Sequence, residues 1–306
     1  MKAIVLAYHN MGLAGLAALR RHGFDIAAVF THEDDPKENC WFGSVKDWAE
    51  RQGIGCCTTD PVNSPQWIEK IERLRPDVLF SFYYRNMVRP EVLAIPRIGA
   101  FNLHGSLLPA YRGRCPVNWV LVRGEEETGV TLHYMVEKPD AGDIVGQKAV
   151  KIDFEDTART LYDKLCEAGG RLLDELLPGV KEEKIPRTKQ DLSRGSYYGG
   201  RTPEDGRVFW DRTALGIYNL IRAVTEPYPG AYAFAENGEK IMIWRAKPIV
   251  SSDGKGPGDV MLDGQSVLVK TGDGAIRLLE IEASGSRWKD AGVGTYFKTG
   301  KVKKLT

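Results

Sequence analysis

Short apolar runs alternate with segments of helical spacing over the first 180 residues, and this alternation restricts the fold more than any other feature of the sequence. The segments 12–23, 43–53 and 64–76 repeat apolar residues at helical spacing. Alternation of this kind predicts βαβ units, and therefore an α/β fold with a Rossmann-like, parallel-rich sheet. Five runs have the length and flanking turns of buried parallel strands: residues 2–8, 25–31, 54–59, 77–84 and 99–105.

The pattern continues to about residue 180 and then changes. Two more strands are predicted at 129–136 and 142–152, and two more helices at 116–124 and 157–179. Between 181 and 206 the chain becomes charged, polar and rich in glycine, which predicts a linker that passes over the surface. We therefore expect a Rossmann-like domain at 1–180, a linker at 181–206 and a smaller domain at 207–306.

The last hundred residues have the pattern of a small all-β domain. A helix is predicted at 213–225, followed by short strands with Asn-Gly or Asp-Gly pairs at 237–238, 263–264 and 273–274. Because these dipeptides favour the tight turns of hairpins, the segment predicts a β-barrel-like, OB-like domain. The final lysines are typical of a solvated terminus: Lys298, Lys301, Lys303 and Lys304.

Composition narrows the class of protein. Lys plus Arg number 42 and Asp plus Glu 41, so the net charge gives no indication of a nucleic-acid partner. The five cysteines are odd in number and lack zinc-binding spacing, which predicts no metal site and a reducing, cytoplasmic location. The apolar run at the N-terminus is short and no 18-residue apolar run follows, so we expect neither a signal peptide nor membrane association.

One cluster of polar residues follows the fifth predicted strand, in the stretch FNLHGSLLPAYRGR at 101–114. Ligand sites of open parallel sheets lie beyond the carboxyl ends of the strands. Asp140 lies 36 residues after His104, in a turn between two predicted strands, and parallel neighbours would bring its carboxylate beside the imidazole. The amide of Asn102 and the imidazole of His104 can donate to a developing oxyanion, and an adjacent aspartate fixes the tautomer of a histidine. The set predicts acyl transfer to an amine.

Two alternatives exist for this cluster. A single asparagine and a single histidine after a strand are commonly structural. An acyl-enzyme would require an activated nucleophile, but the sequence has no GxSxG elbow, and no cysteine accompanies the histidine in an activated setting. We therefore favour direct attack by the amine of the substrate.

The stretch 101–147 resembles the signature of the 10-formyltetrahydrofolate-dependent formyltransferases, which act on glycinamide ribonucleotide, methionyl-tRNA or nucleotide-linked amino sugars. The pattern N-x-H-x-S-L-L-P is followed by a glycine, by T-G-V-T-x-H and by D-x-G-x-I-x-x-Q. The resemblance implies that Asn102, His104 and Asp140 are catalytic and that 10-formyltetrahydrofolate is the formyl donor. It also implies a formyl-transfer domain at 1–180 and a barrel-like C-terminal domain.

Within the family, the chain is most similar to the formyltransferase domains of bifunctional polymyxin-resistance enzymes, which formylate UDP-4-amino-4-deoxy-L-arabinose. This likeness is carried by segments that include 42–54, 80–88 and 199–206. Since those enzymes carry a second, dehydrogenase domain, we expect either a stand-alone enzyme, as a homo-oligomer for example, or a separate dehydrogenase partner. The resemblance implies folate contacts from Asn86, Met87, Val88, Arg114, Val136, Glu137, Lys138 and Pro139.

Four residues are candidates for binding the nucleotide-sugar acceptor. Asn10 and Met11 lie beyond the first predicted strand, and Tyr83 lies at the end of the fourth. Arg201 in the linker has the length and charge to reach an acidic nucleotide group. The alternatives are core packing for Tyr83 and a solvated surface position for Arg201. A further histidine, His133, lies in an alternating strand and is typical of a core or supporting group.

Other functions remain as alternatives. Formylation of methionyl-tRNA uses the same chemistry but would need a basic groove, and residues 201–306 hold only 16 Lys and Arg against 13 Asp and Glu. Amino sugars linked to dTDP or GDP are alternative acceptors. A nicotinamide oxidoreductase is disfavoured because the first predicted turn lacks G-x-G-x-x-G. A non-catalytic folate or nucleotide sensor would have no need of the Asn102, His104 and Asp140 set.

Overall fold

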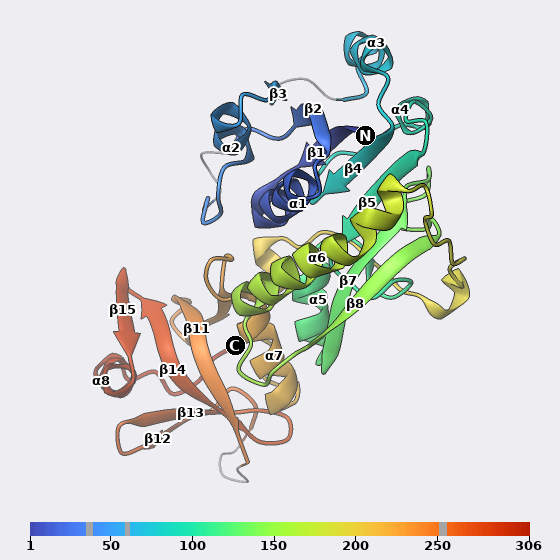
Figure 1. The fold of residues 1–306 in the computed structure, drawn as a ribbon. Helices are drawn as coiled ribbons and strands as arrows, with labels where there is room; N and C mark the ends of the chain where they lie inside the picture. Colours follow the sequence, from blue (N-terminus) through green and yellow to red (C-terminus); the bar gives the residue numbers. More distant parts are fainter. Residues whose placement is uncertain (35–38, 59–61, 251–255) are drawn as a thin grey trace. The chain divides into compact units, whose positions relative to one another are not determined.

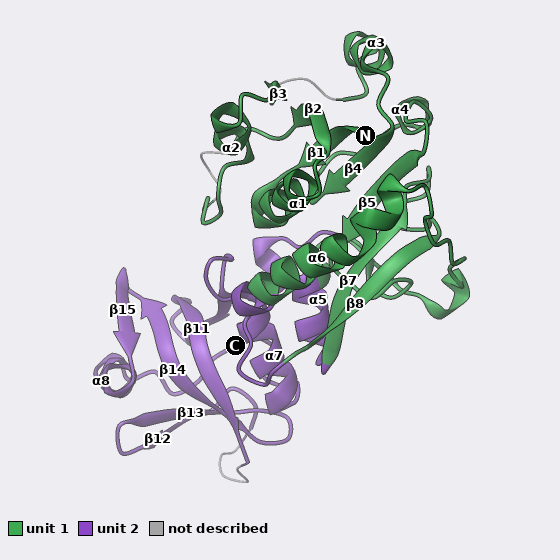
Figure 2. Ribbon diagram, in the orientation of Figure 1, with its two compact units in different colours: residues 1–116, 127–152, 162–199 green, residues 117–126, 153–161, 200–306 purple. Residues whose placement is uncertain are grey.

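The computed structural model describes residues 1–34, 39–58, 62–250 and 256–306. They form two compact units, which are coloured separately in Figure 2. Of the expected linker, residues 181–199 belong to unit 1 and residues 200–206 to unit 2. Unit 1 comprises residues 1–116, 127–152 and 162–199, and unit 2 comprises residues 117–126, 153–161 and 200–306.

Unit 1 is built on a seven-stranded sheet with the strand order β3-β2-β1-β4-β5-β7-β8 (Figure 1). The first five strands in this order pair in parallel, which confirms the predicted α/β fold with a Rossmann-like, parallel-rich sheet. The strands are β1 (Lys2–Ala7), β2 (Asp25–Phe30), β3 (Cys56–Cys57), β4 (Val78–Phe82), β5 (Gly99–His104), β7 (Glu127–Tyr134) and β8 (Ile144–Lys151).

The last two strands of the sheet do not run as the sequence pattern suggested. We expected parallel neighbours to bring Asp140 beside His104, but β7 is antiparallel to β5, and β8 is antiparallel to β7. The turn between β7 and β8 nevertheless reaches β5, because Asp140 lies 3.5 Å from the side chains of Asn102 and His104. Register pairs Asn102 of β5 with His133 of β7, and residues directly opposite in an antiparallel pair project from the same face.

The core of unit 1 is centred on β4, where every residue is buried. The ring of Phe80 stacks on Phe82 and on Phe101 of β5, with ring centroids 5.7 and 5.5 Å apart. Helix α1 (His9–Arg21) approaches this layer closely, because a Cβ atom added at Gly15 would lie 2.3 Å from the Phe82 ring. Burial on both faces is what a central parallel strand requires, and it explains the continuous apolar run of the sequence.

Helices α2, α3 and α6 begin within two residues of their predicted starts, whereas the short helix α4 was not predicted from the sequence. The Ser44 hydroxyl accepts a hydrogen bond from the Asp47 N–H and so caps α2, and α3 begins with proline at its first position. The helices are α2 (Val45–Arg51), α3 (Pro65–Leu74), α4 (Pro90–Leu93) and residues 162–181 of α6 (Ala158–Lys181). In the part of the chain that the structure describes, no helix is long and apolar enough to cross a membrane.

Unit 2 contains a six-stranded antiparallel sheet with the order β10-β11-β14-β13-β12 and β15 paired to β14. The Asn-Gly and Asp-Gly pairs at 237–238, 263–264 and 273–274 lie between paired strands, which confirms the predicted hairpins. Its elements are most of α5 (Pro116–Arg123), α7 (Ala214–Val224), β10 (Ala231–Phe234), β11 (Lys240–Ile249), β12 (Val260–Asp263), β13 (Ser266–Lys270), β14 (Ala275–Ala283), β15 (Ser286–Lys289) and α8 (Ala291–Gly300).

The final residues join the two edges of this sheet. Thr306 exchanges backbone hydrogen bonds of 2.8 and 2.9 Å with Phe234 of β10. On the other side, the Leu305 N–H donates to the Gly258 carbonyl, and the Lys303 carbonyl accepts from Val260 of β12. The tail lysines are exposed as expected, but the backbone that carries them closes the sheet toward a barrel.

This closure predicts that Leu305, which is 1% exposed, supports the core of unit 2. Leu305→Ala is expected to lower the free energy of unfolding by about 2–4 kcal/mol, since it removes buried methyl groups and leaves a cavity. Chemical denaturation measures the change. The neighbouring exposed Lys303→Ala is the matched control and should stay within about 0.5 kcal/mol of the parent. Equal stability of the two variants would show that the tail is not part of the core.

Candidate active site

The site begins with the alternation of side chains along β5. Phe101 and Leu103 point into the core, where they are 0% and 1% exposed, so Asn102 and His104 share the opposite face. His104 is the last residue of the strand and is also buried, at 7% exposure. The strand thus places one amide and one imidazole, two residues apart, at its carboxyl end.

Asp140 contacts both residues from the turn between β7 and β8. Its Oδ1 atom lies 3.5 Å from the Asn102 Nδ2 and 3.5 Å from the His104 Nδ1. These contacts are at the outer limit of hydrogen bonding, so the Asn102 N–H on this side is only weakly held. Of the three side chains identified from the sequence, Asn102 and His104 therefore both contact one carboxylate oxygen of the third, Asp140.

A fourth side chain, His133, completes the cluster. Its Nε2 lies 3.1 Å from the Asn102 Nδ2 and 3.5 Å from the same Asp140 oxygen, and the ring is 2% exposed. The Nδ1 of His133 donates to the Tyr134 carbonyl at 2.8 Å, so Nε2 is the nitrogen that faces the Asn102 amide and the Asp140 carboxylate. His133 thus orients the amide group. The pattern T-G-V-T-x-H marked this residue, but only the antiparallel register shows what it contacts.

The carboxylate of Asp140 is held in its charged form. Burial alone would raise the pKa of Asp140, but His104, His133 and the Gly113 N–H outweigh burial and hold that pKa well below its usual range. The Gly113 N–H donates to Oδ2 at 2.9 Å, while the histidines face Oδ1. Asp140 is therefore a fixed negative charge at neutral pH.

The loop that follows β5 holds the other side of the His104 ring. The Nε2 of His104 is 2.8 Å from the Tyr111 carbonyl, so this nitrogen is the donor and Nδ1 is the one that faces Asp140. Ser106 tightens the same loop, because its hydroxyl donates to the Ala110 carbonyl at 2.7 Å. The loop residues 105–114 thereby fix the tautomer and the orientation of the imidazole.

Several residues at or near this cluster have an unfavourable backbone conformation. Non-glycine residues rarely adopt positive φ, because the side chain then crowds the following carbonyl at a cost of about 1–2 kcal/mol. Strain of this kind gathers at functional sites, where the surrounding structure maintains it. In unit 1 the positive-φ residues include Asp140 (φ 53°), Tyr111 (φ 57°), Cys115 (φ 56°), Tyr83 (φ 60°) and His9 (φ 65°).

The residues that the family resemblance assigns to folate lie in two segments and one loop. The segment 86–88 follows β4, with Met87 57% exposed and Val88 buried, and the Met87 carbonyl accepts a hydrogen bond from Asn63. The segment 136–139 directly precedes Asp140, with Val136 43% exposed. Arg114 has an exposed side chain, and its N–H donates to the Tyr198 carbonyl. Val88 belongs to an apolar cluster of unit 1, and Met135, which precedes the second segment, packs against the same cluster.

The candidate acceptor residues are less uniform. The Asn10 side chain accepts from the Gly43 N–H at 2.9 Å, and the Met11 N–H donates to the Tyr162 hydroxyl at 2.9 Å, so both groups already make internal bonds. The Tyr83 hydroxyl lies beside Gly105, the residue that follows His104.

Arg201 belongs to unit 2. Its guanidinium lies over the ring of Trp119, 4.6 Å from the ring centroid, and donates to the Asp205 carbonyl at 2.9 Å. Both contacts are made within unit 2, so substrate binding by Arg201 remains a prediction.

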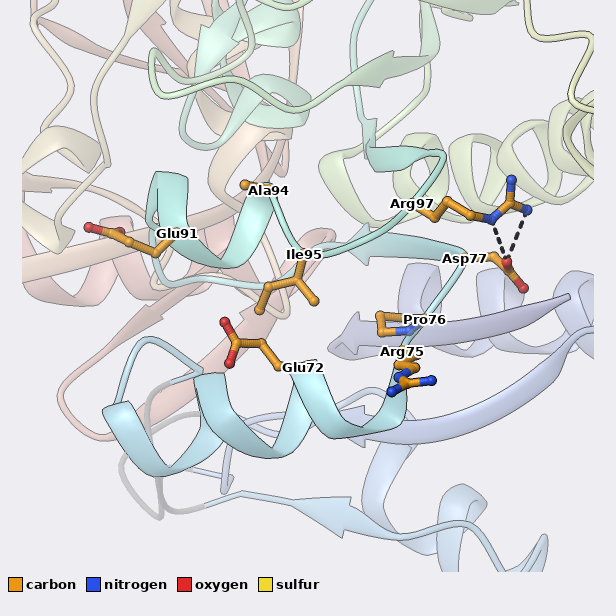
Figure 3. A pocket seen from close by; sticks show the side chains of 8 residues that line it. All are labelled: Glu72, Arg75, Pro76, Asp77, Glu91, Ala94, Ile95 and Arg97. Atoms are coloured by element: carbon orange, nitrogen blue, oxygen red, sulfur yellow. Dashed lines mark hydrogen bonds and ion pairs between the residues drawn. The ribbon is translucent and has the colours of Figure 1, made fainter.

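A surface hollow in unit 1 does not include any of these residues (Figure 3). It lies near the amino ends of β4 and β5, where Arg97 donates to the Asp77 carboxylate. Charged side chains of both signs surround a small apolar floor there. Its lining consists of Glu72, Arg75, Pro76, Asp77, Glu91, Ala94, Ile95 and Arg97. In the part of the chain that is described, no group of three His, Cys, Asp or Glu side chains is placed to hold a metal ion.

An amide and an imidazole at the carboxyl end of a central strand, beside an ionised carboxylate, are groups that a group-transfer enzyme of the α/β class would use. Comparison with protein families makes this specific. Residues 1–177 match the family model described as formyl transferase, and residues 201–292 match the model described as formyl transferase, C-terminal domain. The chain belongs to the formyl transferase family.

Solved structures share its fold. An N-formyltransferase from Helicobacter canadensis, in complex with folinic acid and dTDP-3-aminofucose, has a TM-score of 0.72 and 22% identity over 91% of this chain and 98% of its own. A sugar 3-N-formyltransferase with dTDP and 5-N-formyl-tetrahydrofolate has a TM-score of 0.70 and 20% identity, over 94% and 98%. A sugar N-formyltransferase from a Shewanella species has a TM-score of 0.63 and 19% identity, over 82% and 99%.

Proposed function

We propose that this chain transfers the formyl group of 10-formyltetrahydrofolate to the amine of a nucleotide-linked amino sugar. One observation carries the proposal: Asn102, His104 and His133 converge on a single oxygen of Asp140 in a member of the formyl transferase family. The relatives solved with folinic acid or 5-N-formyl-tetrahydrofolate support the class of donor. The relative solved with dTDP-3-aminofucose supports the class of acceptor.

The residues present suit a folate. Met87 and Val136 expose large apolar side chains on the two segments assigned to it, and a flat ring bound between them would cover that surface. The segment 136–139 directly precedes Asp140, and the segment 86–88 follows β4, which pairs with β5. A formyl group on the N10 nitrogen beside that ring would therefore lie near Asn102 and His104. Bound folate supplies a formyl carbon that an amine can attack.

The side chains of the site then have two tasks: to stabilise the negative charge on the carbonyl oxygen and to move the proton of the amine. As the amine nitrogen bonds to the formyl carbon, the carbonyl oxygen becomes negative. The Asn102 amide donates a hydrogen bond to it, and the Nδ1 of His104 does so once it has taken up the proton of the amine. The attacking nitrogen must lose a proton, which the His104–Asp140 pair accepts and passes to the departing folate nitrogen. When the original carbon–nitrogen bond breaks, the formyl group remains on the sugar amine. His133 holds the Asn102 amide in place through each step.

For the acceptor we propose UDP-4-amino-4-deoxy-L-arabinose first, because segments of the sequence resemble the domains that formylate this sugar. Residues at 80–88 and 199–206 carry that likeness. An amino sugar linked to dTDP is the next choice, since two of the structural relatives were solved with dTDP or a dTDP-sugar.

A panel of UDP-, dTDP- and GDP-linked amino sugars with 10-formyltetrahydrofolate tests both levels of the proposal. Release of tetrahydrofolate and the mass of the formylated sugar are the measurements. We expect the highest kcat/KM with UDP-4-amino-4-deoxy-L-arabinose and none with the corresponding hydroxy sugar. Turnover of a dTDP-linked amino sugar alone would show that the proposed acceptor is wrong but that the acceptor is still a nucleotide-linked amino sugar. Formylation of methionyl-tRNA, together with tight and salt-sensitive tRNA binding, would overturn the sugar proposal.

A further inference from the structure

The segment 188–198, here called the strap, has the composition of a linker but makes a series of bonds to the active site. It begins with Thr188, whose backbone exchanges two hydrogen bonds with Ile144 of β8, at 2.7 and 2.9 Å. It ends in β9 (Tyr197–Tyr198), which pairs in parallel with β6 (Arg112–Gly113) in the loop after β5. The strap is therefore bonded on one side to β8 and on the other to the loop that contacts His104.

The first site contact of the strap is made by Gln190. Its side chain is 7% exposed, and its Nε2 donates to two carbonyls of the catalytic turn, at 3.0 Å to Asp140 and at 2.6 Å to Gly142. Among the described residues, its Oε1 finds no donor, so the amide is oriented by these two bonds alone. Because Asp140 has φ 53°, the backbone of this turn depends on bonds from its surroundings to keep its conformation.

The second contact is made around Ser196. Its hydroxyl accepts from the Tyr111 N–H at 2.8 Å, and its carbonyl accepts from the Arg112 N–H at 3.0 Å. Further along, the Tyr198 ring stacks on the Tyr111 ring, with centroids 5.1 Å apart. The strap thus fixes Tyr111 by its backbone and by its ring.

These contacts lead directly to both catalytic side chains. The Tyr111 carbonyl accepts from the His104 Nε2 at 2.8 Å, and the Gly113 N–H donates to the Asp140 Oδ2 at 2.9 Å. No side chain can replace hydrogen at Gly113, since a Cβ there would lie 2.2 Å from the Tyr198 carbonyl oxygen. The two strands of the small sheet are therefore packed as closely as the backbone allows.

We propose that Gln190 and Ser196, and not the strap as a whole, are positioning residues that set the distance between Asp140 and His104. Gln190 acts through the carbonyl groups of the Asp140 turn, and Ser196 acts through the carbonyl of Tyr111. This inference rests on the proposed function, because it assigns both residues to formyl transfer. It also predicts a selective defect: a displaced carboxylate lowers kcat, whereas the binding of the formyl donor is kept.

The test is a double-mutant cycle with Gln190→Met, which keeps the shape of the side chain but removes both donors. Alone, this change is expected to lower kcat by ~10²-fold, with the KM for 10-formyltetrahydrofolate within about threefold of the parent. In the Asp140→Asn background the same change should lower kcat by less than about threefold, because the carboxylate that it positions is already gone. Lys189→Met, an exposed position of the same strap, is the matched control and should leave kcat unchanged.

A second double-mutant cycle combines Ser196→Ala with His104→Ala. As in the first cycle, Ser196→Ala should lower kcat less in the His104→Ala background than in the parent. An equal loss of kcat from Gln190→Met in both backgrounds, or a normal kcat for this variant at an unchanged melting temperature, would overturn the inference.

A measurement without substrate separates this result from the proposed function. The ¹⁵N chemical shifts of the His104 imidazole, at one pH, should move in Gln190→Met toward their values in Asp140→Asn. If no acceptor is ever turned over, the proposed function fails, and unchanged shifts would then overturn the strap independently.

Discussion

Replacement of His104 with alanine is expected to lower kcat by about 10²- to 10⁴-fold, since it removes both an oxyanion donor and the proton carrier of the pair. The loss should fall on kcat and on kcat/KM alike, because the imidazole acts on charge that exists only in the transition state. Release of tetrahydrofolate under saturating acceptor measures it. Asn102→Ala should lose ~10²–10³-fold by the same measurement, as expected for one oxyanion donor.

His22→Ala is the matched control for this prediction. His22 lies at the end of α1, where its Nε2 is 3.0 Å from the Asp174 carboxylate on the surface of unit 1. Its loss should leave kcat within about twofold of the parent, because surface changes away from the site are nearly neutral. Near-normal turnover of His104→Ala, with an intact far-ultraviolet circular dichroism spectrum, would remove His104 from the chemistry.

Asp140→Asn is expected to have an effect of similar size, of about 10²- to 10⁴-fold on kcat. Asparagine tolerates the positive φ of this position, so the change removes the charge with little disturbance of the turn. The Gly113 N–H and the two histidines then lose the carboxylate that they face. Full activity in Asp140→Asn would show that the negative charge is not required.

The charge of Asp140 also predicts how stability depends on pH. Its pKa in the folded protein is held well below that of an ordinary aspartate, near 3.9 in the unfolded chain. The stabilisation is therefore complete above about pH 4 and is lost as the pH falls toward the folded pKa, where the unfolded chain binds the extra proton. Below pH 4, the free energy of unfolding should fall more steeply in the parent than in Asp140→Asn. Parallel curves in urea titrations would contradict the depressed pKa.

Much of unit 1 is predictable from local sequence. Buried parallel strands are continuous apolar runs. Two helices begin at Ser44 and at the Ser64-Pro65 pair, and such starts depend only on residues that are adjacent in the sequence. The direction of β7 was not predictable, because alternation of polar and apolar residues is the same in parallel and antiparallel strands. The sequence analysis therefore placed Asp140 beside His104 correctly, but on the wrong assumption that the neighbouring strands are parallel.

The supporting groups escaped prediction for a different reason. Gln190 lies 50 residues from the Asp140 carbonyl that it binds, and Ser196 lies 85 residues from Tyr111. Bonds of this span leave no periodic pattern, so a polar, glycine-rich segment looks like a surface linker until the chain is folded. The same is true of the tail, whose lysines are exposed while its backbone pairs with β10 and β12.

The left-handed residues in unit 1 have a consequence for evolution. Each of these positive-φ residues lowers the stability of the folded chain by about 1 kcal/mol relative to glycine in the same conformation. A change such as Cys115→Gly would therefore relieve backbone strain, at the expense of a more flexible unfolded chain. Selection for thermal stability alone would erode such positions, whereas selection for turnover would retain them. Laboratory evolution of this enzyme toward heat tolerance should thus meet a trade-off between stability and activity first around the Asp140 turn and the loop after β5.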